Sequence, residues 1–350
     1  MPFQNSKERL KKIPICTPFN LFTMSVNIQK NAPALLIFIS FATIYIVWGS
    51  TYFFIRVAVT GGIPPFILGA LRYTSAGLLL MTWCAIKGEK IFVWRNIMHA
   101  AISGFLLLFI SNGAVSWAEQ TLPGAMVAIV LSCPPLWIVL LDRKNWSTNF
   151  KNKWTIAGLV IGFSGVLLLF GEQAKGIFLN GAAHSNLPWM LLLVIGTLGF
   201  ALGSLYFKYN LTSGSAPVNS AWQMLAAGLV FVPAGLAHGE YHNLHLQSVP
   251  LNSWLSVIYL SIFGSVAAFS AYTFLLKMRP ATQVSTYAYV NPVVAVILGV
   301  AFTHENISLL QLGGLLVILV SVLLINWEKY RRVRKTEKSG SPKEAAVVDC

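Results

Sequence analysis

The chain contains a series of apolar runs that are each long enough to cross a lipid bilayer. A transmembrane helix needs about 20 mostly apolar residues. Ten such runs lie at residues 33–57, 65–86, 97–118, 122–141, 154–171, 187–207, 216–237, 253–276, 281–302 and 308–327. Charged residues make up 10% of the sequence, whereas soluble domains carry about 25%. A β-barrel is excluded because its strands alternate in polarity over about 10 residues. The sequence therefore predicts an all-α membrane protein with ten transmembrane helices.

Lysine and arginine are distributed unevenly between the connecting segments. Alternate segments, counted from the N-terminus, hold all of the 25 basic residues except Lys175, Arg56 and Arg72. Such a bias over short loops marks the cytoplasmic side, so we expect a multi-pass protein of the cell (inner) membrane with both ends cytoplasmic. The formal net charge of +14 does not indicate nucleic acid as a partner, because the charges form no single basic patch.

The two ends of the chain hold no apolar run. Residues 1–32 and 328–350 are interpreted as basic cytoplasmic tails, the first of them disordered. Met24 is an alternative start, so the expression of residues 1–23 is left open. The cysteines are Cys16, Cys84, Cys133 and Cys350. They form no CxxC pair, so the sequence predicts no zinc or redox site and no cofactor.

Short matching segments recur at an offset of about 151 to 157 residues. The matches pair Gly49-Ser50-Thr51-Tyr52-Phe53 with Gly203-Ser204-Leu205-Tyr206-Phe207, Ala76-Gly77-Leu78 with Ala227-Gly228-Leu229, Pro123 and Pro135 with Pro280 and Pro292, and Gly158-Leu159 with Gly314-Leu315. They divide the chain into repeats at 33–171 and 187–327, joined by an outer linker at 172–186. Because each repeat has five spans, an odd number, the second repeat is inverted in the membrane relative to the first. Inverted repeats are typical of secondary transporters with a site near the bilayer midplane; a duplication kept only for folding is the alternative.

Several motifs resemble those of one transporter family. The segment from Trp48 to Arg56 is similar to the first-span motif of EamA-type exporters in the drug/metabolite transporter superfamily, especially YedA-like members. Further similar segments are Arg72 with Ala76-Gly77, Asn112-Gly113-Ala114 through Glu119 to Pro123-Gly124, and Tyr287 to Val296. The resemblance covers residues 33–327. It implies two five-helix bundles around a central cavity, and export of metabolites such as amino acids, or of toxic compounds, without ATP. Gln120, His304 and Cys133-Pro134 depart from the family pattern and leave the substrate open.

Polar groups inside apolar spans are costly and are therefore candidates for function. Asn112 lies in the third span and Asn291 in the ninth. Pro135 and Pro292 each remove a backbone donor, and carbonyls freed at membrane depth must face protein, water or substrate. We therefore expect the fourth and ninth spans to bend and line the cavity; a kink that serves packing alone is the alternative.

Aromatic side chains with a polar group are frequent in the spans. The candidates for the cavity are Trp48, Tyr52, Trp117, Trp137, Tyr206, Tyr272, Tyr287 and Tyr289. Such rings suit amphipathic or aromatic solutes and organic cations. Packing against lipid, or a place in the interfacial belt, is the alternative role.

Two charged residues are candidates for coupling or for charge recognition. If protons are the coupling ion, Glu119 is the first candidate, because a partly buried carboxyl group holds its proton more tightly. The alternatives for Glu119 are a carboxylate in water or an ion pair with Arg72 or Arg56. Arg72 either binds a substrate carboxylate in a bidentate pair or forms a structural ion pair.

Other function classes have little support in the sequence. Walker A, HExxH and GxSxG motifs are missing, which argues against an enzyme or an ATP-driven pump, and a sensor would usually carry a soluble domain. His238, Glu240, His242 and His245 either bind a metal or lie in a solvated loop, and the second reading is preferred. The sequence thus predicts a lipid-embedded exporter of small metabolites that works by alternating access. A multidrug exporter is the alternative, and the oligomeric state is open.

Overall fold

All regular structure in the described part of the chain is helical. The computed structural model describes residues 34–180, 186–210, 214–303, 308–321 and 323–324. The predicted tails, residues 1–32 and 328–350, lie outside these ranges, as do His304 and Glu305. No strand occurs among the described residues, so the predicted all-α class is confirmed.

Seven stretches of the described chain are long and apolar enough to cross a membrane. They are α2 (Ala34–Thr60), α3 (Pro65–Ile86), Trp94–Ala118, Gly124–Leu141, α10 (Leu187–Tyr209), α11 (Ala216–Ala237) and Leu251–Met278. The other three predicted spans coincide with α9 (Lys153–Asn180), α16 (Tyr287–Thr303) and a helix at Leu309–Ser321. Ten membrane spans stay a prediction. Helix α9 continues to Asn180, into the segment that was predicted as a linker.

Several spans are assembled from shorter helices. The third consists of α4 (Trp94–Gly104), η2 (Phe105–Ile110) and α5 (Ser111–Ala118), and the fourth of α6 (Gly124–Val130) and α7 (Pro134–Leu141). The eighth consists of α13 (Leu251–Tyr259), η6 (Leu260–Ala267) and α14 (Ala268–Met278), and the ninth of α15 (Ala281–Val284) and α16. Short helices η3 (Arg143–Asn145), α8 (Trp146–Asn149), α12 (Glu240–Asn243) and η5 (Leu246–Ser248) lie in the connections.

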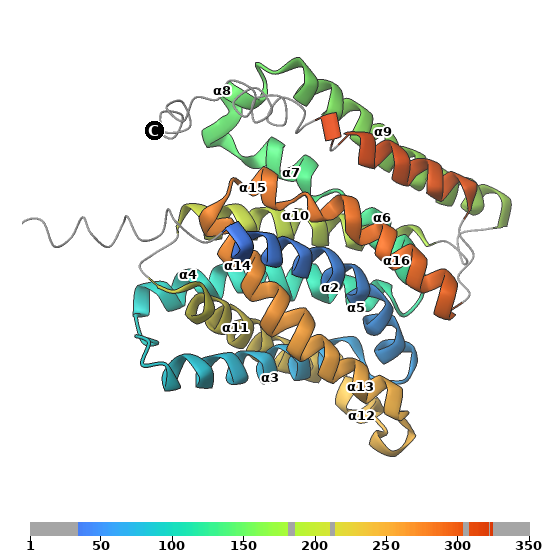
Figure 1. Cartoon of the computed structure of the whole chain (residues 1–350). Helices are drawn as coiled ribbons and strands as arrows, with labels where there is room; N and C mark the ends of the chain where they lie inside the picture. The colour runs from blue at the N-terminus through green and yellow to red at the C-terminus, as the bar shows by residue number, and fades with distance from the viewer. Residues whose placement is uncertain (1–33, 181–185, 211–213, 304–307, 322, 325–350) are drawn as a thin grey trace, which may run out of the picture.

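The long helices run side by side, and successive ones run in opposite directions (Figure 1). The bundle therefore has two ends. The Ala34 end, where α2 begins, also holds the end of α3 and the starts of α4 and α11. The Thr60 end, where α2 ends, holds the ends of α5, α11 and α16. Helix α9 and the helix at Leu309–Ser321 lie together along one side of the bundle (Figure 1).

Contacts between the two halves of the chain come in matching pairs. Helix α2 packs on α16 and α14, and the corresponding helix α10 packs on α7 and α5. In the same way α3 packs on η6, and α11 packs on η2 and α4. The second and seventh spans, α3 and α11, pack on each other. Several contacts made by helices of one half therefore have a counterpart in the other half.

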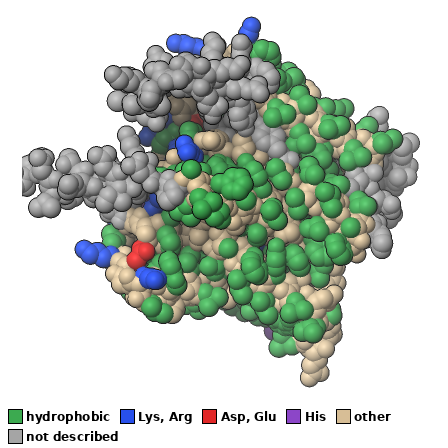
Figure 2. All heavy atoms as spheres, viewed as in Figure 1, with side chains coloured by type: hydrophobic (Ala, Val, Ile, Leu, Met, Phe, Trp, Pro, Cys, Tyr) green, Lys and Arg blue, Asp and Glu red, His purple; other side chains and the backbone are tan. Residues whose placement is uncertain are grey.

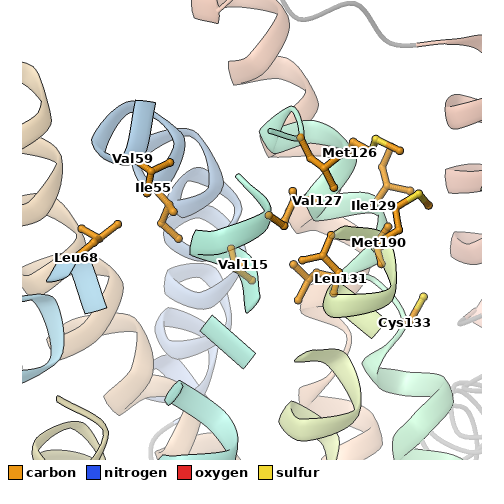
Figure 3. Close-up of a cluster of buried hydrophobic side chains, with 14 of the residues drawn as sticks. Ile55, Val59, Leu68, Val115, Met126, Val127, Ile129, Leu131, Cys133 and Met190 are labelled. Atoms are coloured by element: carbon orange, nitrogen blue, oxygen red, sulfur yellow. The ribbon is translucent and has the colours of Figure 1, made fainter. Parts of the chain in front are cut away.

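Glycines permit the closest of these contacts. A Cβ atom on Gly104 would overlap the backbone of Gln223 in α11, and one on Gly228 would lie 2.8 Å from the backbone nitrogen of Thr74. Apolar side chains fill the remaining space. One cluster at the Thr60 end joins Ile55 of α2 to residues of α5, α6 and α10, including Met126 and Met190 (Figure 3).

The surface of the bundle is apolar over its middle. Figure 2 shows hydrophobic side chains across the visible face, with Lys and Arg gathered toward the Ala34 end and around α8. Large side chains such as Phe38, Ile46 and Leu309 are exposed. Soluble monomers rarely expose contiguous apolar patches of this kind, so the lipid bilayer is the environment that this surface fits.

Candidate functional site

A cavity lies between the two halves of the chain. The second half contributes Phe200 from α10, Gly264 and Ser265 from η6, Phe269 from α14 and Tyr287 from α16. The first half contributes Trp48, Thr51, Tyr52, Ile55, Arg72, Tyr73, Leu108, Ser111, Asn112, Val115, Leu131 and Pro134. The centres of water molecules can occupy about 50 Å³ of the cavity, which is room for a few waters. A larger solute therefore requires the lining side chains to move apart.

Two π-helical segments contact this cavity from corresponding places in the two halves. Segment η2 lies in the third span and η6 in the eighth. A π-helical turn disturbs the regular hydrogen-bond ladder, and such turns are frequent at functional sites. The backbone carbonyl of Gly264 accepts a hydrogen bond from Nε1 of Trp48 at 3.1 Å. Segment η6 is therefore tied to α2 at the cavity wall.

Four aromatic rings form one wall of the cavity and its support. Trp48 lies 4.9 Å from Tyr272 and 5.2 Å from Tyr287, measured between ring centroids. Phe200 contacts the same rings. Trp48, Phe200 and Tyr287 face the cavity, whereas Tyr272 lies behind them and its hydroxyl group is 2.7 Å from Ser204 Oγ. These rings are contributed by both halves of the chain.

Arg72 is the charged side chain among the lining residues. It is 5% exposed, and its Nε donates a hydrogen bond to Ser265 Oγ at 2.8 Å. Its Cζ lies 4.9 Å from the ring centroid of Tyr73. The structural ion pair that the sequence left open for Arg72 is not found among the described residues.

The two candidate asparagines have different surroundings. Asn112 lines the cavity, and its Nδ2 donates to the carbonyl of Leu107 at 3.1 Å. Asn291 is 2% exposed and does not line the cavity. Its side-chain nitrogen, in the amide orientation that fits its neighbours, donates to the carbonyls of Tyr287 and Tyr45. Asn291 therefore joins α16 to α2 through a hydrogen bond.

The helix breaks in the fourth and ninth spans are only partly where we expected them. The fourth span is interrupted between Val130 and Pro134, because Pro134 and Pro135 both lack the N–H that a continuous helix needs. Pro134, rather than Pro135, lines the cavity. Pro292 lies inside α16 and does not end it. The ninth span is interrupted earlier, at Ser285 and Thr286.

Glu119 lies at the Thr60 end and is fully buried, so the reading of a carboxylate in water is wrong. Arg56 Nη1 donates to the backbone carbonyls of Glu119 and Leu122 at the end of α5. A matching contact occurs at the Ala34 end, where Lys208 Nζ donates to the carbonyls of Leu276 and Arg279 at the end of α14. Cations at helix C-termini satisfy carbonyls that have no helical donor.

Three of the candidate aromatic residues lie away from the cavity. Trp137 donates from Nε1 to Thr197 Oγ1 at 2.9 Å, between α7 and α10. The hydroxyl of Tyr206 is 2.8 Å from Nδ1 of His99, near the Ala34 end. Trp117 packs on Trp189 and His238 near the Thr60 end. Tyr289 belongs to α16, but its side chain lies outside the described part of the chain.

The His238–His245 segment is not simply a solvated loop. His242 and His245 are exposed, but Glu240 is 5% exposed. Its carboxylate accepts hydrogen bonds from the backbone nitrogens of Phe66 at 2.9 Å and Ile67 at 3.0 Å, at the start of α3. A carboxylate satisfies the free N–H groups of a helix N-terminus and interacts favourably with the helix dipole. No group of potential metal ligands occurs among the described residues.

Some cavity residues were missed in the sequence. Thr51, Ser111 and Ser265 are small polar residues that also occur as ordinary helix residues in apolar spans. The Gly264-Ser265 pair is the one usable signal, because an isolated glycine in an apolar segment can mark a close approach of the backbone. The π-helical form of η2 and η6 has no sequence signal that we recognise.

Comparison with known proteins identifies a transporter family. The sequence profile of the EamA-like transporter family matches residues 34–171 and again residues 187–327. The inner membrane transporter YedA of Escherichia coli K12 is 36% identical over 290 residues, covering 82% of this chain and 89% of YedA. The chloroplastic WAT1-related protein At3g02690 of Arabidopsis thaliana is 25% identical and covers 80% of the chain and 67% of its own length.

Two further proteins extend the comparison. The protein PecM of Dickeya dadantii is 26% identical over 84% of this chain and 94% of PecM. A protein known from a crystal structure superposes with a TM-score of 0.60 at 20% sequence identity, covering 84% of this chain and 97% of that protein. At that identity the likeness concerns the fold alone.

Proposed function

The chain belongs to the EamA-like transporter family, and we propose that it is a secondary transporter that exports small metabolites, such as amino acids or related amphipathic solutes, across the cell membrane. The observation that carries the proposal is the cavity between the two halves, which combines aromatic rings, neutral polar groups and one guanidinium group. Membership of a transporter family also argues against an enzyme. The direction of transport rests on the resemblance to EamA-type exporters.

Alternating access is the proposed mechanism. The halves 33–171 and 187–327 act as inverted five-helix repeats that rock around the cavity, as in other transporters with inverted repeats. Two features support this mechanism: the matching contacts between the halves, and the cations Arg56 and Lys208, which hold the ends of α5 and α14 at opposite ends of the bundle. Each of these contacts is suited to stabilise closure of one end.

Both chain termini are proposed to be cytoplasmic, which puts the Ala34 end on the cytoplasmic side. The lysines and arginines gathered toward that end support this orientation (Figure 2). Glu119, near the opposite end, is the proposed proton-coupling group. Its full burial supports the proposal, because a buried carboxyl group can exchange a proton between two conformations that differ in solvation.

The experiment begins with the identity of the solute. Metabolites in the medium are compared between cells with and without the protein, and the solute that differs is then measured as flux in proteoliposomes. Asn112→Ala is expected to reduce this flux about tenfold at unchanged thermal stability, because Asn112 lines the cavity. Asn291→Ala is expected to lower stability as well, because Asn291 joins α16 to α2.

The controls separate metabolite export from multidrug export. Amines and dyes are tested in the same strains, and protection against a range of them without a change in any metabolite would favour a multidrug exporter. If overexpression neither alters a metabolite nor protects against a toxic compound, the proposed function is wrong.

A further inference from the structure

Arg72 is a buried cation within an apolar helix that is long enough to cross a membrane. It lies about two turns after the start of α3, is 5% exposed, and borders the cavity. A guanidinium group has five N–H donors, and the hydrogen bond to Ser265 Oγ uses the one at Nε. No described residue accepts a hydrogen bond from the two terminal nitrogens, so their donors are open to a partner in the cavity.

No acidic residue lines the cavity beside this guanidinium group. Glu119 interacts electrostatically with the lining residue Tyr52 but does not itself line the cavity. The acidic side chains that the structure describes lie outside the cavity lining. Glu89 follows α3, and Asp142 accepts hydrogen bonds from Tyr209 and Asn145. Glu240 caps α3, and Glu119 lies beside Arg56. A buried cation without an opposite charge is costly, so an anion that enters the cavity is favoured over a neutral solute or a cation.

Room beside the guanidinium group depends on Gly264. A Cβ atom at this position would lie 3.1 Å from Nη2 of Arg72 and 3.1 Å from Cγ2 of Thr51. Any larger residue would therefore crowd Nη2 of Arg72. The aromatic rings of Trp48, Phe200 and Tyr287 line the same cavity. A solute in the cavity would therefore contact both the guanidinium group of Arg72 and these rings.

We propose that Arg72 is the binding site for the carboxylate of the transported solute, and that the solute is an organic monocarboxylate whose apolar or aromatic body packs against Trp48, Phe200 and Tyr287. The planar guanidinium fork matches a carboxylate. One guanidinium balances one negative charge, so a phosphate dianion would leave excess charge buried. An organic cation would be repelled. This inference rests on the proposed transport function and narrows its substrate class.

The test uses three solutes with the same aromatic body and different charge: 3-phenylpropionate, L-phenylalanine and 2-phenylethylamine. Binding to the purified full chain in nanodiscs is measured by titration of tryptophan fluorescence and by thermal shift. We expect wild-type protein to bind 3-phenylpropionate most tightly and 2-phenylethylamine at least about tenfold more weakly, with L-phenylalanine between them. Arg72→Gln should weaken the binding of 3-phenylpropionate about tenfold or more and remove the preference for the anion.

Arg95→Gln is the matched control, because it removes the same charge from an exposed position at the start of α4. It should leave the preference unchanged. Arg72→Lys keeps the charge without the planar fork, and should retain the preference for the anion with weaker binding; it also serves if Arg72→Gln does not fold. The inference is overturned if wild-type protein binds none of the three, if it binds the amine as well as the acid, or if folded Arg72→Gln keeps the preference. Metabolite export measured in cells would still test the proposed function separately.

Discussion

Nε1 of Trp48 donates a hydrogen bond to the backbone carbonyl of Gly264, with 3.1 Å between the two atoms. This bond joins α2 of the first half to the π-helical segment η6 of the second half at the cavity wall. It satisfies a carbonyl group at membrane depth, where an unpaired one is costly. The same indole ring contacts Phe200, Tyr272 and Tyr287, so Trp48 links the wall of the cavity to its aromatic support.

Trp48→Phe should keep the apolar packing and lose the bond to Gly264. We expect the free energy of unfolding to fall by about 1 kcal/mol and solute flux in proteoliposomes to fall about tenfold. Trp146→Phe is the control, because Trp146 also donates from its indole to a carbonyl, that of Leu140 at 2.8 Å, but lies away from the cavity. Equal loss of flux in the two variants would contradict a specific role for Trp48.

Arg56→Gln and Lys208→Gln should have opposite effects on access to the cavity. Each removes a cation that holds a helix C-terminus at one end of the bundle. We expect the first variant to open the Thr60 end and the second the Ala34 end, each by about tenfold in population, which is the usual worth of a charge-assisted hydrogen bond. A cysteine placed at Ser111, labelled separately from each side of the membrane, measures the change. Equal effects on both sides would refute the idea.

Gly104→Ala should impair folding, because the added Cβ atom would overlap backbone atoms of Gln223 and separate α4 from α11. Backbone atoms cannot move aside cheaply in a packed interface, so we expect the yield of folded protein in detergent to drop severalfold. Gly313→Ala is the matched control. It lies in the helix at Leu309–Ser321 with nothing within 4 Å of an added Cβ atom, and should stabilise this helix by about 0.5–1 kcal/mol. Normal yield of Gly104→Ala would contradict the close packing.

Glu240 should make stability depend on pH. Burial raises the pKa of its carboxyl group above the ordinary value, although the N–H groups of Phe66 and Ile67 and the nearby His238 oppose this shift. A raised folded-state pKa means that the folded protein binds the proton more tightly. Protonation of Glu240 therefore contributes its full stabilisation to the free energy of unfolding below the ordinary glutamate pKa of about 4.3. This contribution is lost as pH rises through the folded-state pKa.

The pH dependence of Glu240 is tested by the midpoint of thermal unfolding. It is measured between pH 4 and pH 7 for wild-type protein and for Glu240→Gln. The difference between the two curves should change in that window, with wild type losing stability relative to the variant as pH rises. Parallel curves would show that Glu240 does not titrate there.

The sequence predicted which helix carries each candidate residue better than the direction in which its side chain points. Trp48, Tyr52, Arg72, Asn112 and Tyr287 border the cavity as we expected. Trp137 and Tyr206 lie on suitable helices but point to Thr197 and His99. In a soluble helix the apolar stripe reveals the buried face. A span that is apolar all round gives no such signal, so the sequence could not predict the direction in which each aromatic side chain points.

Helix irregularities were harder still to predict. Pro134-Pro135 interrupts the fourth span as expected, but α16 accommodates Pro292, and the ninth span breaks at Ser285 and Thr286 instead. Prolines remove donors and do not by themselves decide where a helix ends. The cap that Glu240 provides for α3 joins residues 174 positions apart in the sequence, and local patterns carry no information on such contacts.

Alternating access requires that one cavity between the two halves opens in turn to each side of the membrane. The most direct measurement places a single cysteine at Ser111, which lines the cavity, in a chain whose four native cysteines are replaced, and labels it with a membrane-impermeant maleimide. Ser103→Cys, which is buried away from the cavity, is the control and should not react. We expect Ser111→Cys to be labelled both in right-side-out and in inverted membrane vesicles. Labelling from one side only, or from neither, would contradict it.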